Sequence, residues 1–399
     1  MPKMSNLVKK FYSEHPIIFD FIKSAYDKYR KNMISFNNYD RQHLAVREGI
    51  EKELDKIVNF RTDYQFWFYE RRFERDFARL FGKKFGVGVS SGTAALQFSL
   101  VASGIKDGDE VITVPYNFIA TALAIFNMGA KPVFVDIDID RYTIDAGNIE
   151  DAITEKTKAI LPVHLYGCPC NMNEIAKIAK ANNLKIIEDC AQAHGAEYKG
   201  KKVPVKDIGC FSFNTSKILG GLGNGGIVVT NDRGIKNRID ILRDPAANDD
   251  LVRLSKRTPC FLDAVQIAFI KAKLPFFLKW VEKRREIAHI YNEELKGASI
   301  ETPVEGKNVK HSYFRYVIRS KKRDKLGEFL FKHGVETQVE YDLPLHLTRT
   351  FRNLGYKKGD FPITEKCSSE VLSLPLNPFL EEDEIMKIIK LIKLFDRKN

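Results

Sequence analysis

The stretch FSFNTSKILGGLGNGG, residues 211–226, places a single lysine between an apolar run and a cluster of glycines. Lys217 comes shortly after GCFSF, which has the composition of a buried strand, and Gly220 and Gly221 follow it closely. Withdrawal from water lowers the pKa of a lysine amine and favours its neutral, nucleophilic form. Glycines let the backbone pass close to a bound group, because they carry no Cβ atom. The stretch therefore predicts a reactive amine beside a ligand.

Three other apolar runs end in residues of a kind that binds ligands. In SSGTAAL, Gly92 and Thr93 open a predicted helix, whose free N–H groups and positive dipole end suit a phosphate. LKIIED brings Asp189 to its end, and VPYNF places Phe118 where its ring could stack on a planar ligand. Each position also has a plain structural explanation, as a helix cap or as a core aromatic ring.

Together these positions form the set that a pyridoxal phosphate enzyme needs. Such an enzyme binds its cofactor through a lysine, sets an acid against the pyridine nitrogen and anchors a phosphate. Open α/β sheets bind ligands at the carboxyl ends of their strands. We therefore expect the lysine, the acid, the ring and the phosphate cradle to meet at one edge of a sheet.

The pattern around these residues indicates an α/β domain. Short apolar runs alternate with segments whose apolar residues recur every three to four positions. This alternation predicts a mostly parallel sheet that is covered on both faces. The predicted strands are FGVGVS, EVITVP, PVFVDID, KAILPVHL, LKIIED, IGCFSF and GIVVTN.

Two further units flank this domain in the prediction. Residues 1–45 carry two helical patterns that predict an N-terminal arm, which packs on the body or a dimer partner or contacts a membrane surface. Residues 46–285 form the large domain, which ends within a long helix that is interrupted near Pro275. Residues 286–399 predict a smaller α+β domain, with strands in SYFRYVIRS and VETQVEY and helices in KLGEFLFKHG and EEDEIMKIIKLIKLF.

Composition restricts the class of protein. With 399 residues, 44% of them hydrophobic and 29% charged, the chain is expected to be globular with a well-buried core. We find no membrane span and no signal-peptide pattern, so a cytoplasmic location is expected. The net charge of +12 suits phosphorylated ligands, but the basic residues are scattered, which argues against nucleic-acid binding. The six cysteines show neither a disulfide framework nor zinc spacing, so we expect free thiols and no metal.

The order and wording of the motifs resemble one family, the sugar aminotransferases of the DegT/DnrJ/EryC1/StrS group, which are fold type I pyridoxal phosphate enzymes. The similarity runs from about residue 45 to the C-terminus. It implies a large α/β domain with a mostly parallel seven-stranded sheet, a smaller α+β C-terminal domain, and a homodimer with active sites at the subunit interface. The matching segments include SSGTAAL, GDEVITVP, GAKPVFVDID, ILPVHLYG, IIEDCAQAHGA, KRREIA and PLHL.

The resemblance also implies roles for individual residues. Lys217 would hold pyridoxal 5'-phosphate as a Schiff base and then shuttle a proton, and Asp189 would pair with the pyridine nitrogen. Phe118 would stack on the ring, and Gln192 would face its phenolic oxygen. The remaining matched positions are Gly92, Thr93 and Ser212 at the phosphate, and His164, Tyr341 and His346 near the substrate pocket.

The implied reaction is a ping-pong transamination. Glutamate or glutamine would give its amino group to the cofactor, and a keto sugar would then receive it and leave as an amino sugar. A nucleotide-linked acceptor is expected, and the length of the glycine stretch after Lys217 favours carbon 3 over carbon 4. A dehydratase subgroup carries histidine at this position, so the lysine favours transamination. A sugar phosphate or cyclitol ketone as acceptor remains an alternative, as does a regulatory protein that keeps the fold without turnover.

Several positions depart from the family's pattern. Asn214 replaces a common histidine or tyrosine, and PYNFIATA is one residue short. The family's Asn-x-Arg, whose asparagine typically reaches the neighbouring subunit's phosphate, is replaced by Pro259 and Phe261. The segment RTDYQFWFYERRFERDF stands where the family carries a glycine, and it indicates either helix packing or recognition of an unusual substrate. Its candidate substrate-binding residues are Arg61, Gln65 and Trp67.

Overall fold

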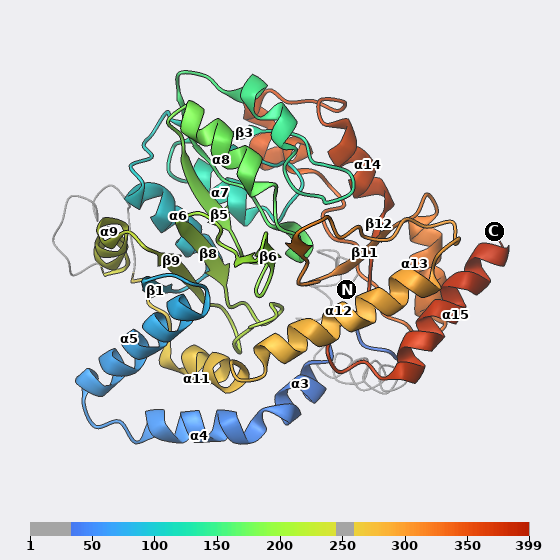
Figure 1. Ribbon diagram of the computed structural model, residues 1–399, viewed down its shortest axis with the longest axis horizontal. Coiled ribbons are helices and arrows are strands. Elements are labelled where there is room, and N and C mark those ends of the chain that lie inside the picture. Colours follow the sequence, from blue (N-terminus) through green and yellow to red (C-terminus); the bar gives the residue numbers. More distant parts are fainter. Residues whose placement is uncertain (1–32, 245–258, 399) are drawn as a thin grey trace, which may run out of the picture.

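A computed structural model of the chain describes residues 33–244 and 259–398. Its main sheet has the strands β1 (Phe85–Val89), β2 (Glu110–Thr113), β3 (Lys131–Phe134), β4 (Thr157–Ile160), β5 (Lys185–Asp189), β8 (Ile208–Ser212) and β9 (Gly226–Thr230). The strand order is β1-β9-β8-β5-β4-β2-β3 (Figure 1). Within this sheet β9 runs antiparallel to both of its neighbours, and the other pairs are parallel. The predicted mostly parallel, seven-stranded sheet is confirmed, and each strand overlaps a predicted run, although β3 and β4 begin one residue before theirs.

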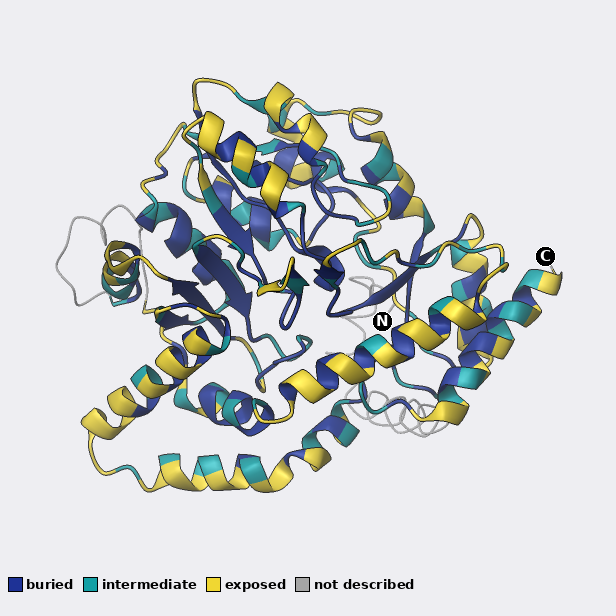
Figure 2. Cartoon of the chain, in the orientation of Figure 1, coloured by how far each residue is buried: buried dark blue, intermediate teal, exposed yellow. Residues whose placement is uncertain are grey.

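The strands read as continuous apolar runs because helices cover both faces of the sheet. Every residue of β2, β8 and β9 is buried (Figure 2), although successive side chains point to opposite faces. Helix α6 (Gly92–Ala102) packs on β8 and β9, and α8 (Met172–Ala181) packs on β4 and β5. The helices α7 (Ala120–Phe126) and α9 (Arg233–Arg243) complete the layers beside β3 and β1.

A group of helices lies beyond the β1 edge of the sheet (Figure 1). It consists of α3 (Tyr39–Ala45), α4 (Arg47–Val58), α5 (Asp63–Leu80) and α11 (Ala264–Lys273). Helix α11 packs against α4 and α5, and Val46, Ile50 and Phe269 share one apolar cluster. Of the predicted N-terminal arm, residues 1–32 lie outside the described residues, and α3 belongs to the remainder.

The C-terminal part forms its own core around a two-stranded antiparallel ribbon of β11 (Tyr316–Arg319) and β12 (Val371–Leu374). The helices α13 (Arg323–Lys332), α14 (Pro362–Glu370) and α15 (Glu382–Lys398) surround it. Helix α12 (Phe277–Glu294) links the two parts, because Phe277 packs with the large core and Tyr291 with the C-terminal one. The predicted boundary at residues 285 and 286 falls within α12, and this division stays a proposal.

The helix interruption near Pro275 is confirmed, since α11 ends at Lys273 and α12 begins at Phe277. The strand expected in VETQVEY is wrong: Val335 and Gln338 form isolated bridges, and Tyr341 adopts a left-handed φ of 60° that turns the chain. The remaining short elements are β6 (Glu197–Tyr198), β7 (Lys201–Lys202), β10 (Val309–Lys310) and the 3-10 helices Ala146–Asn148, Glu150–Ala152, Leu165–Gly167, Leu345–Leu347 and Arg349–Leu354.

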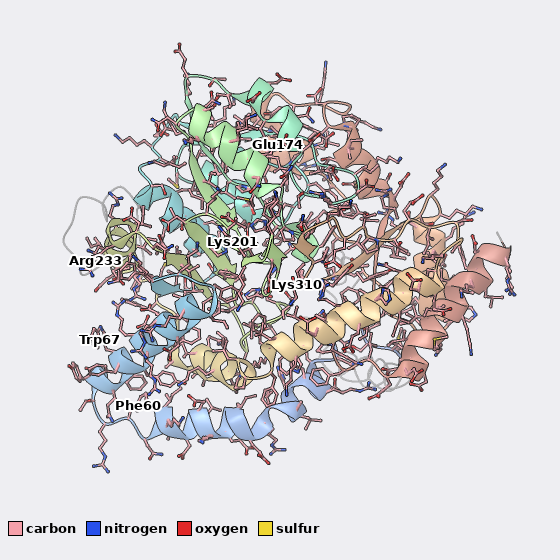
Figure 3. The ribbon with its side chains drawn as sticks, viewed as in Figure 1. Phe60, Trp67, Glu174, Lys201, Arg233 and Lys310 are labelled. Atoms are coloured by element: carbon pink, nitrogen blue, oxygen red, sulfur yellow. The ribbon has the colours of Figure 1, made fainter. Side chains whose placement is uncertain are left out.

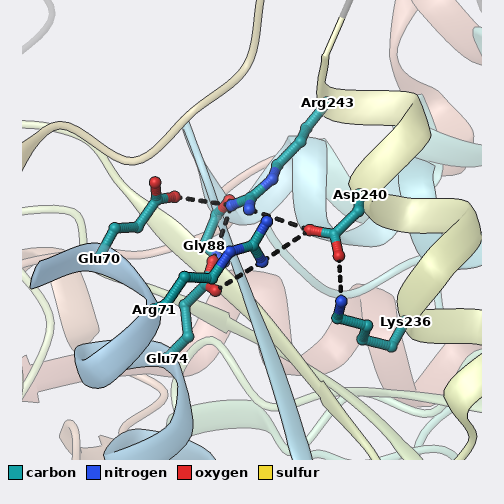
Figure 4. A network of polar contacts seen from close by, with 7 residues as sticks. All are labelled: Glu70, Arg71, Glu74, Gly88, Lys236, Asp240 and Arg243. Carbon is teal, nitrogen blue, oxygen red and sulfur yellow. Dashed lines mark hydrogen bonds and ion pairs between the residues drawn. The ribbon is translucent and has the colours of Figure 1, made fainter. Parts of the chain in front are cut away.

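A buried charge network ties β1 to α5 and α9 (Figure 4). Arg243 donates hydrogen bonds of 2.7 Å to both Glu70 and Glu74 and one of 2.8 Å to the carbonyl of Gly88. Asp240 pairs with Arg243 at 2.9 Å. Burial raises the pKa of Glu70 to about 7, against the pull of Arg243. Removing one partner of such a buried pair costs roughly 3–5 kcal/mol, so the network fixes the strand that leads to SSGTAAL.

No helix within residues 33–244 and 259–398 is long and apolar enough to cross a membrane. All six cysteines are free thiols, as expected, and five of them are buried. One group of three possible metal ligands occurs in the described ranges, namely His164, Glu188 and Cys190. The oxygens of Glu188 already accept hydrogen bonds from the N–H groups of Val205 and Lys206 at 2.7 and 2.6 Å.

Candidate active site

A cavity of about 490 Å³ opens at the carboxyl ends of β5 and β8, where the C-terminal part meets the large sheet. Eight of the ten predicted site residues line it, contributed by segments that are far apart in the sequence. They are Gly92, Thr93, Phe118, Asp189, Gln192, Ser212, Lys217 and Tyr341. The predicted meeting of lysine, acid, ring and phosphate cradle at one sheet edge therefore occurs in the structure.

Lys217 projects into this cavity from the loop that follows β8. In the described part of the chain its Nζ has no hydrogen-bond acceptor, and it lies 4.7 Å from the centre of the Phe314 ring. Desolvation lowers the pKa of Lys217 to about 8, and the positive charge of Arg315 acts in the same direction. A substantial fraction of the amine is therefore neutral near physiological pH and available as a nucleophile.

The glycines after Lys217 are required by close backbone approaches. A Cβ atom on Gly220 would collide with the carbonyl oxygen of Thr215, and one on Gly226 would lie 2.5 Å from the carbonyl carbon of Ser91. A residue of α11 also holds the loop, because the buried Lys273 donates a 2.6 Å hydrogen bond to the carbonyl of Gly220. The glycine cluster thus shapes a tight loop that fixes the direction of Lys217.

Asp189 ends β5 and is 4% exposed. Burial raises the pKa of this carboxyl, while hydrogen bonds from the Thr121 hydroxyl at 2.7 Å and the Ala191 N–H at 3.0 Å oppose the rise. No cation pairs with it among the described residues. A buried carboxylate that lacks a cationic partner favours a ligand with a protonated nitrogen.

The N-terminus of α6 presents N–H groups of the kind that bind a phosphate group. Ser91 caps the helix, since its Oγ accepts a 3.1 Å hydrogen bond from the Ala94 N–H. The N–H groups of Gly92 and Thr93 have no partner within the helix and line the cavity. A Cβ atom on Gly92 would lie 2.8 Å from the Cβ of Ser212, so the third cradle residue sits directly against this turn.

A chain of polar contacts positions the opposite wall. The Gln192 side chain donates to the Tyr341 hydroxyl at 2.9 Å and accepts from the Tyr166 N–H at 2.9 Å. Burial raises the pKa of Tyr341 far above its usual value, so its hydroxyl stays protonated. Phe118 is 59% exposed, so its face is available to a planar ligand.

His164 and His346 do not line the cavity. The ring of His164 is fully buried: its Nδ1 accepts from the Cys170 N–H at 3.1 Å, and its Nε2 lies 2.9 Å from Glu188. His346 is 1% exposed, and its Nε2 lies 3.2 Å from Glu365. Both rings are engaged with carboxylates.

Two charged residues of the cavity were missed by the sequence reasoning. Arg315 and Glu340 line it and form an ion pair with an Nε–Oε1 distance of 2.6 Å. Arg315 belongs to SYFRYVIRS, which reads as an ordinary strand, and Glu340 lies in the wrongly predicted strand. A charged residue amid aromatic ones in an apolar run is the signal that could have identified Arg315.

The departures from the family's pattern occupy distinct places. Asn214 lines the cavity, and its side chain bonds to Asn224 at 2.9 Å. Phe261 lies outside the lining, with its ring centre 5.3 Å from the Arg243 guanidinium. In α5, Trp67 lies on the outside of the molecule (Figure 3), and Gln65 caps its own helix by accepting from Thr62 N–H at 3.2 Å. Helix capping by Gln65 and stacking of Trp67 on Tyr64 occur in this segment, and substrate recognition by it stays a prediction.

The arrangement fits pyridoxal phosphate. An amine of lowered pKa, a buried acid without a cation, an exposed ring face and a helix N-terminus converge on one cavity. When bound, this cofactor supplies an electron sink for carbanions that form next to an amino group.

Comparison with known proteins agrees with this geometry. A model of the DegT/DnrJ/EryC1/StrS aminotransferase family matches residues 48–393. A pleiotropic regulatory protein of Geobacillus stearothermophilus is 39% identical over 89% of this chain and 96% of its own length. The dTDP-3-amino-3,6-dideoxy-alpha-D-galactopyranose transaminase of Aneurinibacillus thermoaerophilus is 39% identical over 77% of this chain and 85% of its own. A UDP-N-acetyl-3-dehydro-alpha-D-glucosamine 3-aminotransferase of Acidithiobacillus ferrooxidans is 38% identical over 77% of this chain and 83% of its own length.

Solved structures show the same fold. DesV of S. venezuelae superposes with a TM-score of 0.86 at 32% identity, covering 91% of this chain and 98% of its own. NtdA of Bacillus subtilis, solved with the bound cofactor PMP, superposes with a TM-score of 0.78 at 28% identity, covering 91% and 86%. The expected fold type I architecture is confirmed. The chain therefore belongs to the DegT/DnrJ/EryC1/StrS aminotransferase family, and it is an enzyme that depends on pyridoxal phosphate.

Proposed function

We propose that this enzyme moves an amino group from glutamate or glutamine to carbon 3 of a nucleotide-linked keto sugar in a ping-pong reaction. The observation that carries the proposal is that Lys217 and Asp189 line one cavity together with the N-terminal turn of α6. The reaction needs a base close to the substrate's α-carbon and a fixed negative charge at the far side of the cofactor ring. Lys217 and Asp189 meet these two needs.

Each of the two residues has a defined task in this proposal. Asp189, ionised, holds a proton on the pyridine nitrogen, and the hydrogen bond from Thr121 favours its ionised form. Lys217 Nζ first holds the cofactor and, once released, carries a proton from the donor's α-carbon. The lowered pKa of the amine, about 8, makes it an effective base near neutral pH.

The other predicted residues bind and orient. Gly92, Thr93 and Ser212 hold the phosphate through N–H and hydroxyl groups. Phe118 covers the ring face, and Gln192 meets the phenolic oxygen while it fixes the hydroxyl of Tyr341 beside the substrate. These assignments are supported by the shared cavity lining.

The preference for carbon 3 is supported by two named relatives. The dTDP- and UDP-linked relatives described above carry names in which the amino group is placed at carbon 3. The glycine stretch after Lys217 points in the same direction. We also propose that the enzyme acts as a homodimer in the cytoplasm, with a large domain over residues 46–285 and a small one over 286–399.

A panel of acceptors tests the proposal. Holoenzyme and L-glutamate are incubated with nucleotide-linked 3-keto sugars, 4-keto sugars, a keto sugar phosphate and a cyclitol ketone, and the products are identified by mass and NMR spectroscopy. Amination of the nucleotide-linked 3-keto sugars is expected. Amination of 4-keto sugars alone refutes the preference for carbon 3, and amination of the sugar phosphate or cyclitol ketone alone refutes the nucleotide-linked acceptor.

A regulatory role is the second candidate, because one relative is named a pleiotropic regulatory protein. The two functions differ in the spectrum of the purified protein when L-glutamate is added. Transamination converts the cofactor's lysine-bound form to its aminated form and moves its absorption to shorter wavelength. A bound cofactor that responds to no amino donor supports the regulatory role.

A further inference from the structure

We infer that Arg315 binds the α-carboxylate of the amino donor and thereby selects an α-amino acid in the first half-reaction. This inference rests on the proposed function, because it assigns a substrate group to a residue of the same cavity. Arg315 precedes β11 and is 7% exposed, and the resemblance gave it no role.

The guanidinium of Arg315 is held in a fixed plane. Its Nε donates to Glu340 at 2.6 Å, and its Nη1 donates to Asn37 at 3.3 Å. The group lies over the ring of Phe314 at 4.1 Å and over that of Phe36 at 4.8 Å. A guanidinium that is held by two rings and one carboxylate loses little further freedom when it binds a ligand.

One nitrogen of this group remains for a ligand. Within residues 33–244 and 259–398, Nη2 of Arg315 has no protein acceptor, whereas Nε donates to Glu340 and Nη1 donates both to Asn37 and, at 3.5 Å, to the carbonyl of Phe314. Arg315 lines the cavity. Because guanidinium groups bind carboxylates through charge-assisted hydrogen bonds, an incoming carboxylate can meet Nη2 and share Nη1.

Arg315 lies close to Lys217, and this proximity favours the amino donor, rather than the acceptor, as the ligand of Arg315. Both contact the ring of Phe314, the lysine Nζ at 4.7 Å and the guanidinium at 4.1 Å. In an amino acid the carboxylate is one bond from the carbon that bears the reacting amine. In a nucleotide-linked sugar the diphosphate lies several bonds from the keto carbon. An anion bound beside Lys217 is therefore the donor's α-carboxylate.

The balance of charge agrees with this assignment. Arg315 is one of the groups that lower the pKa of Lys217, after desolvation, whereas Glu340 acts in the opposite direction. A carboxylate that binds to Arg315 offsets its positive charge close to the lysine. A bound donor carboxylate therefore raises the pKa of the released Lys217 amine, which makes this amine a stronger base for the α-proton.

The test compares Arg315→Gln and Arg315→Lys with the wild-type holoenzyme. The matched control is Arg285→Gln, since Arg285 also pairs with a glutamate, Glu305 at 2.5 Å, but does not line the cavity. The first half-reaction is followed by absorbance in single turnovers at varied L-glutamate. The same measurement with 4-aminobutyrate, which lacks the α-carboxylate, reports the contribution of that group.

Arg315→Gln is expected to raise the apparent Kd for L-glutamate by roughly 10- to 150-fold, the effect of losing a charge-assisted hydrogen bond. Its rate with 4-aminobutyrate and its KM for the acceptor stay at the wild-type values. Arg315→Lys keeps the positive charge but lacks the planar guanidinium, so its Kd for L-glutamate is expected to lie between those of the wild type and Arg315→Gln. Arg285→Gln behaves as wild type in both assays.

A wild-type Kd for L-glutamate in Arg315→Gln overturns the inference and leaves the proposed function in place. A rise in the acceptor's KM instead of the donor's Kd shows that the arginine binds the acceptor and likewise overturns it. A wild-type holoenzyme that reacts with neither glutamate nor glutamine overturns the proposed function and this inference together. If Arg315→Gln does not fold, the ratio of glutamate to 4-aminobutyrate rates in Arg315→Lys decides.

Discussion

Replacing Gly92 by alanine tests whether the α6 turn is the phosphate cradle. The added Cβ would lie 2.8 Å from Ser212 Cβ and 3.3 Å from its Cα. Unstrained carbon atoms sit about 3.5–4.0 Å apart, so α6 or β8 must shift by several tenths of an ångström. Overpacking of this kind lowers the free energy of unfolding by roughly 1–3 kcal/mol. The higher helix propensity of alanine raises it by about 1 kcal/mol. The expected net loss in the free energy of unfolding is about 0–2 kcal/mol.

Gly92→Ala should weaken the binding of pyridoxal phosphate more than it lowers the free energy of unfolding. The shift moves the N–H groups of Gly92 and Thr93, and the loss of one charge-assisted hydrogen bond to the phosphate costs roughly 1.5–3 kcal/mol. This corresponds to a Kd for pyridoxal phosphate that is about 10- to 150-fold higher. The assay is a titration of cofactor-free protein followed by absorbance, with the free energy of unfolding measured in urea on the same samples.

The matched control is Gly327→Ala in α13. A Cβ there would meet Leu372 and Thr337 at an ordinary 3.5 Å, and Gly327 does not line the cavity. Helix propensity alone then stabilises the variant by roughly 0.4–1 kcal/mol, without a change in cofactor affinity. If Gly92→Ala binds the cofactor as tightly as Gly327→Ala does, the cradle assignment is refuted.

Three further outcomes follow from the cavity. Lys217→Ala should lose covalent cofactor attachment, measured as added mass after borohydride reduction, and all turnover, while keeping the wild-type circular dichroism; residual transamination contradicts its role. Asp189→Asn should keep measurable cofactor but lose roughly 10- to 150-fold in kcat, the effect of one charge-assisted hydrogen bond, and near-normal turnover would count against the pyridinium pairing. Because the pKa of Lys217 is lowered to about 8, the amine is protonated below and neutral above that pH. The rate of covalent cofactor capture by cofactor-free protein should therefore rise from pH 7 to pH 9, and a flat profile argues against a lysine that titrates in this range.

Local pattern predicted the sheet well for a physical reason. Strands covered on both faces must be apolar throughout, so each of the seven strands appears as a short uninterrupted run. The residues that follow such runs, Asp189 after β5 and Lys217 after β8, could therefore be assigned to the ligand-binding edge. The segment VETQVEY has the alternating pattern of a strand, but it forms only isolated bridges at Val335 and Gln338. The chain then turns at Tyr341, which has a left-handed φ of 60°.

The parts of the site that sequence could not predict depend on tertiary contacts. Arg315 lies in an apolar segment, and its role is visible only once Phe36, Phe314 and Glu340 surround it. His164, by contrast, matches a family motif yet faces Glu188 behind the wall. A sequence motif shows which residue follows a strand. The direction in which its side chain points depends on neighbours that are distant in the sequence.

The charges of the cavity suit the proposed reaction, in which two unlike substrates use one site in turn. In the described residues its lining carries two cationic side chains, Lys217 and Arg315, and two anionic ones, Asp189 and Glu340. The N-terminus of α6 adds no side-chain charge, so in the proposed function N–H and hydroxyl groups hold the cofactor's phosphate, and neither cation is needed for it. In the proposed reaction the donor's carboxylate would bind Nη2 of Arg315, while Nε keeps its pair with Glu340. The acceptor then enters a cavity whose reacting end is electrically balanced, which suits the uncharged hydroxyl and keto groups of a sugar.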